Sequence, residues 1–152
     1  LAEGLPAGFG AALGYYLAAE HVPPAALGLF AARAALPWTF QFVWGPVVDR
    51  FQGSRMGGRR AWVLGAQWLA ALASLGGLAV RDPVAEVWLL AGVLFLHSLC
   101  SSVQDTAVDA LAIGVTPAAE RGRTNAVMRA GFLTGVGAGT VGFAHLLRGA
   151  GY

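Results

Sequence analysis

Long apolar stretches separated by short polar breaks dominate the chain. The apolar residues run continuously instead of alternating with polar ones, which predicts α-helices and argues against a β-barrel. Several stretches reach about the 20 residues that a helix needs to cross a ~30 Å bilayer core. The pattern predicts an all-α membrane protein with about five transmembrane helices, at residues 1–19, 25–48, 61–80, 85–115 and 120–147.

The polar breaks set the expected topology. The longest break, between Trp44 and Trp62, holds Asp49 and the arginines at positions 50, 55, 59 and 60, and the break after the fourth helix holds Arg121 and Arg123. Six arginines on this side face only Arg81 and Arg148 on the other, and positive charge marks cytoplasmic loops. We therefore expect the amino end inside the cell, Tyr152 outside, and the chain in the cytoplasmic (inner) membrane.

Composition supports a membrane protein and excludes several other classes. Hydrophobic residues make up 57% of the chain and charged residues 12%, where a soluble domain has about 25% charged residues. The mean hydropathy is +0.61. The arginines lie in short loops, so the net charge of +2 does not predict nucleic acid as a partner. With Cys100 as the single cysteine, the sequence predicts no disulfide within the chain, and no metal or cofactor site.

The chain is expected to be one partial transmembrane domain over residues 1–152, because it starts without Met and ends just after a predicted helix.

Two acidic residues near the end of the fourth helix are the main candidates for chemistry. Asp105 and Asp109 are spaced i and i+4, so they share one helical face, and carboxylates so close together favour protonation of one of them. At ~1.5 Å per residue from Glu86, Asp105 lies ~28 Å along the helix, at the cytoplasmic end. The pair is either a proton-coupling or gating cluster, or two carboxylates at headgroup level. Residues at a similar depth that could join them are Glu3, Gln104, Asn125 and Arg129.

Arg33 and His97 fall deeper in the predicted helices, where an unpaired polar group is costly. Arg33 is a candidate for anion or substrate binding, or for a salt bridge to a helix outside the chain. His97 is a candidate for substrate or proton contact, or for a simple hydrogen bond to a backbone carbonyl. His97, Ser101 and Asp105 share a helix face, but one straight helix does not converge them as a hydrolase triad requires, so no enzyme is predicted.

Three motifs in order resemble one transporter family. Gly45-Pro-Val-Val-Asp49-Arg50 followed by Gly57-Gly-Arg59-Arg60 resembles the loop between helices two and three of the major facilitator superfamily. One branch of this family contains the AmpG-like muropeptide permeases and the acetyl-CoA transporters. This chain resembles that branch in the length of the loop and in two further motifs, Gln104-Asp105-Thr-Ala-Val-Asp109 and Pro117-x-x-Glu120-Arg121-Gly122.

The resemblance implies a twelve-helix secondary carrier that works by alternating access, of which this chain is a partial amino-terminal half. It implies two partners, a small-molecule solute and the other half of the carrier. It also implies that Asp49 forms charge pairs with Arg50, Arg59 and Arg60, and that these pairs keep a cytoplasmic gate closed. It further implies proton-coupled uptake of a muropeptide or similar solute, with Asp105 and Asp109 as coupling candidates. Relatives often carry Lys where this chain has Gln41. Other solute carriers (acetyl-CoA or drug-type) and a non-transporting scaffold or receptor remain alternatives.

Overall fold

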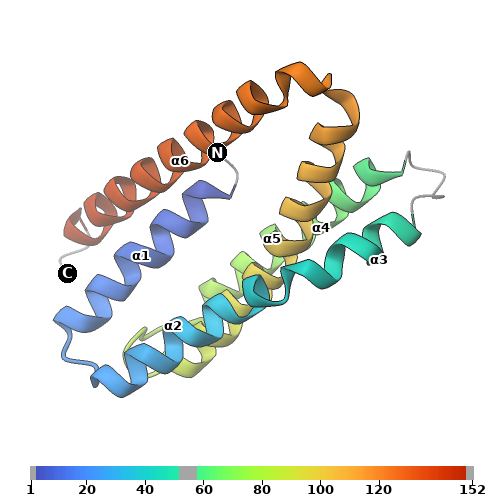
Figure 1. Cartoon of the computed structure of the whole chain (residues 1–152). Coiled ribbons are helices and arrows are strands. Elements are labelled where there is room, and N and C mark those ends of the chain that lie inside the picture. The colour runs from blue at the N-terminus through green and yellow to red at the C-terminus, as the bar shows by residue number, and fades with distance from the viewer. Residues whose placement is uncertain (1–2, 52–57, 150–152) are drawn as a thin grey trace. The chain divides into compact units, whose positions relative to one another are not determined.

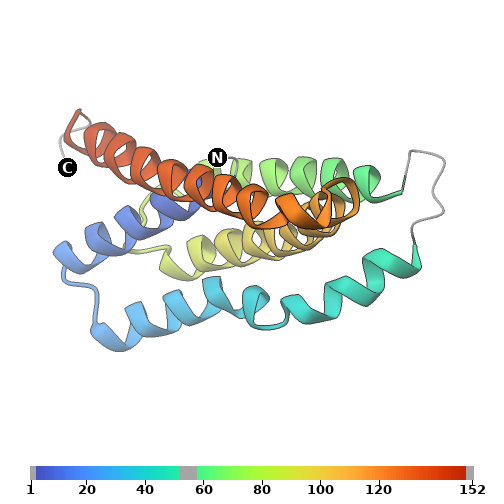
Figure 2. The same cartoon turned by 45° about the horizontal axis from the view of Figure 1, so that its top comes forward.

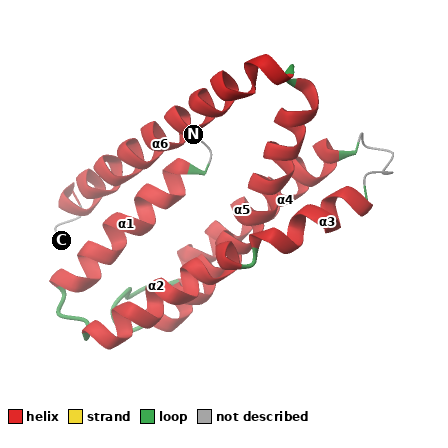
Figure 3. Ribbon diagram, viewed as in Figure 1, coloured by secondary structure: helices red, strands yellow, loops and turns green. Residues whose placement is uncertain are grey.

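The computed structural model describes residues 3–51 and 58–149, and every regular element in these ranges is a helix (Figure 3). This confirms the predicted all-α fold. In chain order the elements are α1 (Gly4–Ala19), α2 (Pro24–Thr39), η1 (Gln41–Val43), α3 (Trp44–Arg50), α4 (Arg59–Leu75), η2 (Gly76–Ala79), α5 (Val87–Val115), η3 (Ala118–Glu120) and α6 (Arg121–Gly149).

The described chain divides into two compact units. The first contains α1 and α6, from residues 3–27 and 117–149. The second runs over residues 28–116 and contains most of α2 together with the elements from η1 to α5. The single domain expected over residues 1–152 stays a prediction.

In the first unit, α1 and α6 lie side by side through glycine contacts (Figure 1). A Cβ atom on Gly8 would collide with the carbonyl oxygen of Val136, and one on Gly139 would collide with that of Leu5, so the two backbones touch directly. The Thr140 hydroxyl adds a hydrogen bond to the Gly8 carbonyl oxygen at 3.2 Å. Such close approach of small residues is the usual way in which membrane helices associate.

Helix α1 has two pairs of glycines spaced four residues apart, and the two pairs behave differently. Gly4 and Gly8 face α6, whereas a Cβ on Gly10 or Gly14 would meet no atom within 4 Å in the described part of the chain. One of the two pairs is used for helix packing within this unit.

Helix α1 ends in a hydrogen-bonded turn just before Pro23 and Pro24. His21 has φ 61°, a left-handed conformation usual for glycine, and its N–H donates to the Ala18 carbonyl at 3.2 Å. The Val22 N–H donates back to the Leu17 carbonyl at 3.1 Å, and both of these side chains are buried. This pair of bonds closes the helix before Pro24 begins α2.

The second predicted span, 25–48, is not one continuous helix. It is interrupted at Phe40, followed by the short η1 and then α3. Pro46 limits where α3 can begin, and Pro37 weakens α2 just before the break. Pro37 lacks the N–H that would bond the carbonyl four residues earlier, and Pro46 falls in the first turn of α3, where the backbone N–H has no partner within the helix.

In the second unit, α4 and α5 pack along their lengths, as both views show (Figure 2). The buried positions of α4 are Ala66, Ala70 and Ala73, which follow the helical repeat and let α5 approach closely. Gly58, with φ 63°, precedes α4 in a conformation that favours glycine. The short η2 continues α4 to Ala79, close to the predicted end of the third span.

Within the described residues, three helical stretches are long and apolar enough to cross a bilayer: Arg59–Ala79, Val87–Val115 and Ala118–Gly149. Helices α1 and α2 have 16 residues each, so the predicted crossings by the first two spans stay predictions. Large apolar side chains such as Trp68, which is 70% exposed, cover the outside of the second unit. Such a surface suits lipid or further helices.

The glycine contact between α1 and α6 yields a test. Replacing Gly8 with leucine should destabilise the protein by about 1–3 kcal/mol, because the new side chain meets backbone atoms of α6 that have no room to move. Gly10→Leu is the matched control, since a Cβ there meets open space. Unfolding in detergent measures both. Equal stability of the two variants would show that α1 and α6 do not approach in this way.

Candidate functional site

The break in the second span attaches to α5 through two side chains. Gln41, the first residue of η1, donates from Nε2 to Asp105 Oδ2 across 2.6 Å. Trp44, the first residue of α3, donates from its indole Nε1 to Ser102 Oγ across 3.1 Å. Ser102 and Asp105 are three residues apart in α5 and so lie on one face of it. The interrupted helix is thus held at two points, one turn apart.

The contact at Ser102 is buried and fully bonded. Ser102 is 0% exposed, and its hydroxyl donates to the Leu99 carbonyl at 2.9 Å. A hydroxyl has one proton to give and can still accept, so the indole of Trp44 completes its bonding. A buried bond of this kind is expensive to lose, because the abandoned groups would have no water to replace it.

The carboxylate of Asp105 meets a neutral partner. Asp105 is half-buried, and the group that donates to it from the second span is a carboxamide. Gln104 beside it is 7% exposed, and Asp109, one turn further, is exposed. The predicted pair therefore spans two environments: Asp105 lies in the packed part of α5, and Asp109 lies nearer solvent.

His97 connects α4 and α5. Its Nδ1 lies 2.8 Å from Ser74 Oγ and 3.2 Å from the Ala70 carbonyl oxygen, and its Nε2 lies 3.2 Å from Ser101 Oγ. The Ser74 hydroxyl also lies 3.0 Å from the Ala70 carbonyl and donates to it. Since a carbonyl only accepts, the contact between Nδ1 and the Ala70 oxygen requires a proton on Nδ1.

These contacts favour the simpler of the two expectations for His97, a hydrogen bond to a backbone carbonyl. The contacts also show that His97, Ser101 and Asp105 do not form a hydrolase triad, because Asp105 does not bond His97. Ser101 does contact His97, but the carboxylate of Asp105 accepts from Gln41, and the other imidazole nitrogen faces Ser74 and Ala70.

Asp49 and Arg59 form the ion pair at the polar end of the unit. Arg59 Nη2 lies 2.8 Å from Asp49 Oδ1, and Arg59 Nη1 donates to the Ala110 carbonyl of α5 at 3.2 Å. One guanidinium thus joins the end of α3, the start of α4 and the carboxyl-terminal part of α5. A cation is favourable near the carboxyl end of a helix, because the helix dipole is negative there.

Arg33 lies over the ring of Trp88, with 4.6 Å between its guanidinium carbon and the ring centroid. Trp88 is the second residue of α5, so Arg33 is level with the beginning of that helix and far along it from Asp105. Both side chains are exposed in the described chain. The position at the start of α5 differs from the deep location expected for Arg33 from the sequence.

The other predicted residues are distributed over both units. Arg129 lies over Phe132 at 5.6 Å in the first unit, which also holds Glu3, and their predicted pairing with Asp105 and Asp109 stays a prediction. Of the gating motif, Gly45, Asp49 and Arg50 belong to α3, and Arg59 and Arg60 begin α4. Arg55 and Gly57, together with Tyr152, lie outside the described residues.

The sequence reading missed three members of the site: Trp44, Ser102 and Ser74. It noted Gln41 only as a departure from related sequences. The available signal was the pair of prolines at 37 and 46, which together predict an interruption, and the serines within an otherwise apolar helix.

Comparisons with known proteins agree with this arrangement of helices and charges. The profile described as Major Facilitator Superfamily matches residues 4–152. The chain is 30% identical to the anhydromuropeptide permease of Escherichia coli (strain K12) over 136 residues, which are 89% of this chain and 27% of that protein. It is 34% identical over 84 residues to a Rickettsia typhi protein provisionally named transporter AmpG 3, covering 53% of this chain and 20% of that protein.

The chain spans under a third of the length of these relatives. No solved structure matches it significantly. An all-helical protein with membrane-length apolar helices and a paired Asp-Arg loop is a multi-pass membrane protein. The chain belongs to the major facilitator superfamily, and the predicted membership is confirmed.

The Asp49–Arg59 pair can be measured by a double-mutant cycle. Asp49→Asn, Arg59→Gln and the double variant should give a coupling energy below about 1 kcal/mol, because the two side chains are 57% and 28% exposed and water screens them. Arg59→Gln alone should cost more than Asp49→Asn alone, since it also removes the bond to Ala110. Equal losses in thermal unfolding would contradict the bridging role of Arg59.

Proposed function

We propose that the complete protein is a secondary carrier that moves a small solute across the cytoplasmic membrane by alternating access. The observation that carries this proposal is membership of the superfamily over residues 4–152, together with the Asp49–Arg59 pair at the loop where α3 and α4 meet. Family membership favours a transporter over an enzyme. In carriers of this kind, two helical bundles rock about a central site, so charges at the rim can exchange partners at low cost.

The proposed substrate is a muropeptide or similar cell-wall sugar-peptide. Support comes from the relative named anhydromuropeptide permease, whose similarity covers 89% of the chain. The remaining part of the carrier, which this chain does not include, supplies the rest of the substrate site in this proposal.

Proton coupling is proposed for Asp105, with Asp109 as the second carboxylate of the pathway. Asp105 is half-buried in a membrane-length helix and bonded to a neutral carboxamide from Gln41. Among the contacts described for Asp105, the donor from the second span is a neutral amide and not a cation that would hold it in a fixed ion pair. Asp109, being more exposed, provides the connection to water on the cytoplasmic side in the proposed orientation.

Another solute carrier of the same fold, of the acetyl-CoA or drug type, is the second candidate. It is favoured by one observation: the position at which relatives often carry a lysine holds Gln41, and its amide is already bonded to Asp105. Arg33 does not take the place of that lysine, because it stacks on Trp88 at the start of α5. A drug-type solute with less negative charge suits this arrangement better than an anionic sugar-peptide or the more strongly anionic acetyl-CoA does.

Uptake measurements test coupling. In the complete protein reconstituted into vesicles, Asp105→Asn should abolish proton-driven uptake of labelled muropeptide, because the amide does not take up and release a proton. Asp109→Asn should reduce it strongly. Glu20→Gln, in the exposed turn after α1, is the control and should transport normally. Undiminished proton-driven uptake by both aspartate variants, at equal expression, would remove their coupling role. Transport of a different solute only would favour the second candidate, and no transport at all would favour a scaffold or receptor.

Cysteine accessibility tests the gate. Asp49→Ala should increase labelling of cysteines placed on the cytoplasmic side of the central cavity and decrease it on the external side, because the ion pair closing that side is lost. Arg59→Ala should shift labelling in the same direction. Unchanged labelling in both variants would show that this pair does not hold the gate.

A further inference from the structure

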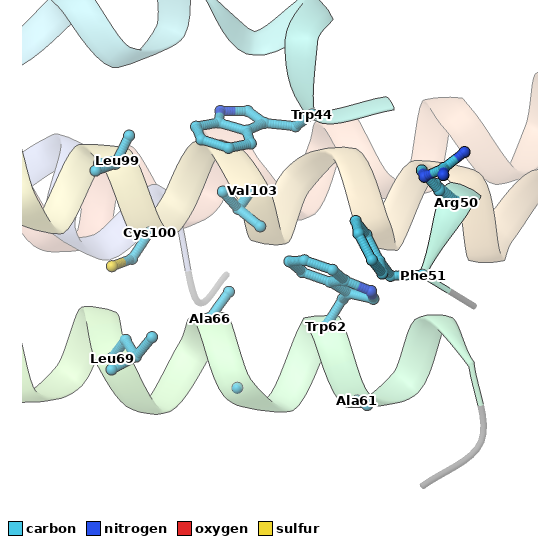
Figure 4. Close-up of a pocket in the computed structure, with 11 residues that line it drawn as sticks. Trp44, Arg50, Phe51, Ala61, Trp62, Ala66, Leu69, Leu99, Cys100 and Val103 are labelled. Atoms are coloured by element: carbon cyan, nitrogen blue, oxygen red, sulfur yellow. The ribbon is translucent and has the colours of Figure 1, made fainter. Parts of the chain in front are cut away.

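An apolar groove lies within the second unit, beside the polar end of α3 (Figure 4). Six side chains form most of its walls, and we call it the aromatic groove: Trp44, Phe51, Trp62, Leu69, Leu99 and Val103. Its volume is about 1030 Å³. This is at the upper end of the ~300–1,000 Å³ typical of small-molecule sites, so an occupant of considerable size fits.

Small residues of α4 make the hollow. Gly65 and Ala66 lie between Trp62 and Leu69 on the lining face, and Ala61 lies just before Trp62. A Cβ atom on Gly65 would meet nothing within 4 Å, which shows that open space begins directly at the backbone. The groove follows α4 from residue 61 to residue 69, or ~12 Å at the helical rise. That length is most of one ~15 Å leaflet of hydrocarbon.

Of the described residues that line the groove, Arg50 alone is charged. Figure 4 shows Arg50 at the same end as Phe51 and Trp62, while Leu69 and Leu99 form the opposite end. Arg50 is the last residue of α3 and so borders the polar break that the arginine distribution assigns to the membrane interface. The groove is therefore apolar along its length, with two tryptophans in its walls and a cation at the interfacial end.

We propose that the aromatic groove binds one phospholipid with an anionic headgroup, with its phosphate on Arg50 and an acyl chain lying along α4 between Trp44 and Trp62. A guanidinium pairs well with phosphate, and arginines near the membrane surface attract anionic lipid. Tryptophan is favoured where acyl chains meet headgroups. The walls of the groove offer few polar partners, which suits an acyl chain. A site for a polar solute needs such partners, so the groove is distinct from the proposed transport site.

A sugar-containing solute does not fit these walls. Its hydroxyl and amide groups would lose water on entering and gain too few hydrogen bonds in return. The lipid proposal goes beyond transport, and it holds or fails independently of which solute the carrier moves.

Tryptophan quenching tests the proposal in the complete protein, reconstituted in phosphatidylcholine vesicles. A variant keeps Trp44 and Trp62, with every other tryptophan replaced by phenylalanine. Phosphatidylglycerol with brominated acyl chains should quench the two indoles at a several-fold lower mole fraction than brominated phosphatidylcholine does. Arg50→Gln should remove this preference, and Gly65→Phe, which fills the groove, should weaken quenching by both lipids.

Two controls match these variants. Arg60→Gln removes a neighbouring arginine that does not line the groove, and Gly92→Phe enlarges a glycine of α5 that also has open space at its Cβ. Neither should change the quenching. An equal loss of preference in Arg60→Gln would assign the effect to the overall positive charge of that side and overturn the site.

Absence of quenching by either lipid would show that another part of the protein covers the groove, which also overturns the proposal. Equal quenching by both lipids, insensitive to Arg50→Gln, would mean ordinary contact with bulk lipid and would have the same consequence. A second measurement does not depend on the variants folding. Native mass spectrometry of the unaltered protein, purified from membranes that contain phosphatidylglycerol, should show one retained anionic phospholipid, and retention of none would contradict the site.

Discussion

The hydrogen bonds between the interrupted second span and α5 are the constraint on which the second unit depends. Inside a bilayer no water is present to replace a lost hydrogen bond, so polar side chains must find partners within the protein. At the break, Gln41 and Trp44 bond Asp105 and Ser102, which fixes the register of the second span against α5. This placement also puts Trp44 in the wall of the aromatic groove and Asp49 within reach of Arg59. The position of the break thus determines the geometry of both the ion pair and the groove.

The first unit solves a different problem by different means. Helices α1 and α6 contain few polar groups that could pair across their interface, so they rely on direct backbone contact at glycines and on the Thr140 hydroxyl. A polar network fixes register through specific partners, while a glycine interface fixes it through shape. Each unit therefore has its own source of specificity.

The sequence predicted most of the helical architecture, because continuous apolar runs bounded by prolines, glycines and arginines are strong signals. It also predicted the Asp49 and Arg59 motif and the carboxylates at 105 and 109. It did not predict the break at Phe40, because the apolar pattern continues past Pro37 and Pro46 as a single run over residues 25–48. It did not reveal the partners of Asp105 and His97, since the bonds from Gln41 and Ser74 join residues 64 and 23 positions apart. Contacts over such separations depend on packing, which no local pattern records.

The guanidinium of Arg59 has a consequence for the segment that links α3 to α4. Because it clamps Asp49 on one side and α5 on the other, the two helix ends are fastened together at the base of the link itself. The entropy of closing a loop grows only slowly with its length. The spacing between these two helix ends is therefore held by side chains of the helices themselves, so a longer connection between α3 and α4 would cost little in stability.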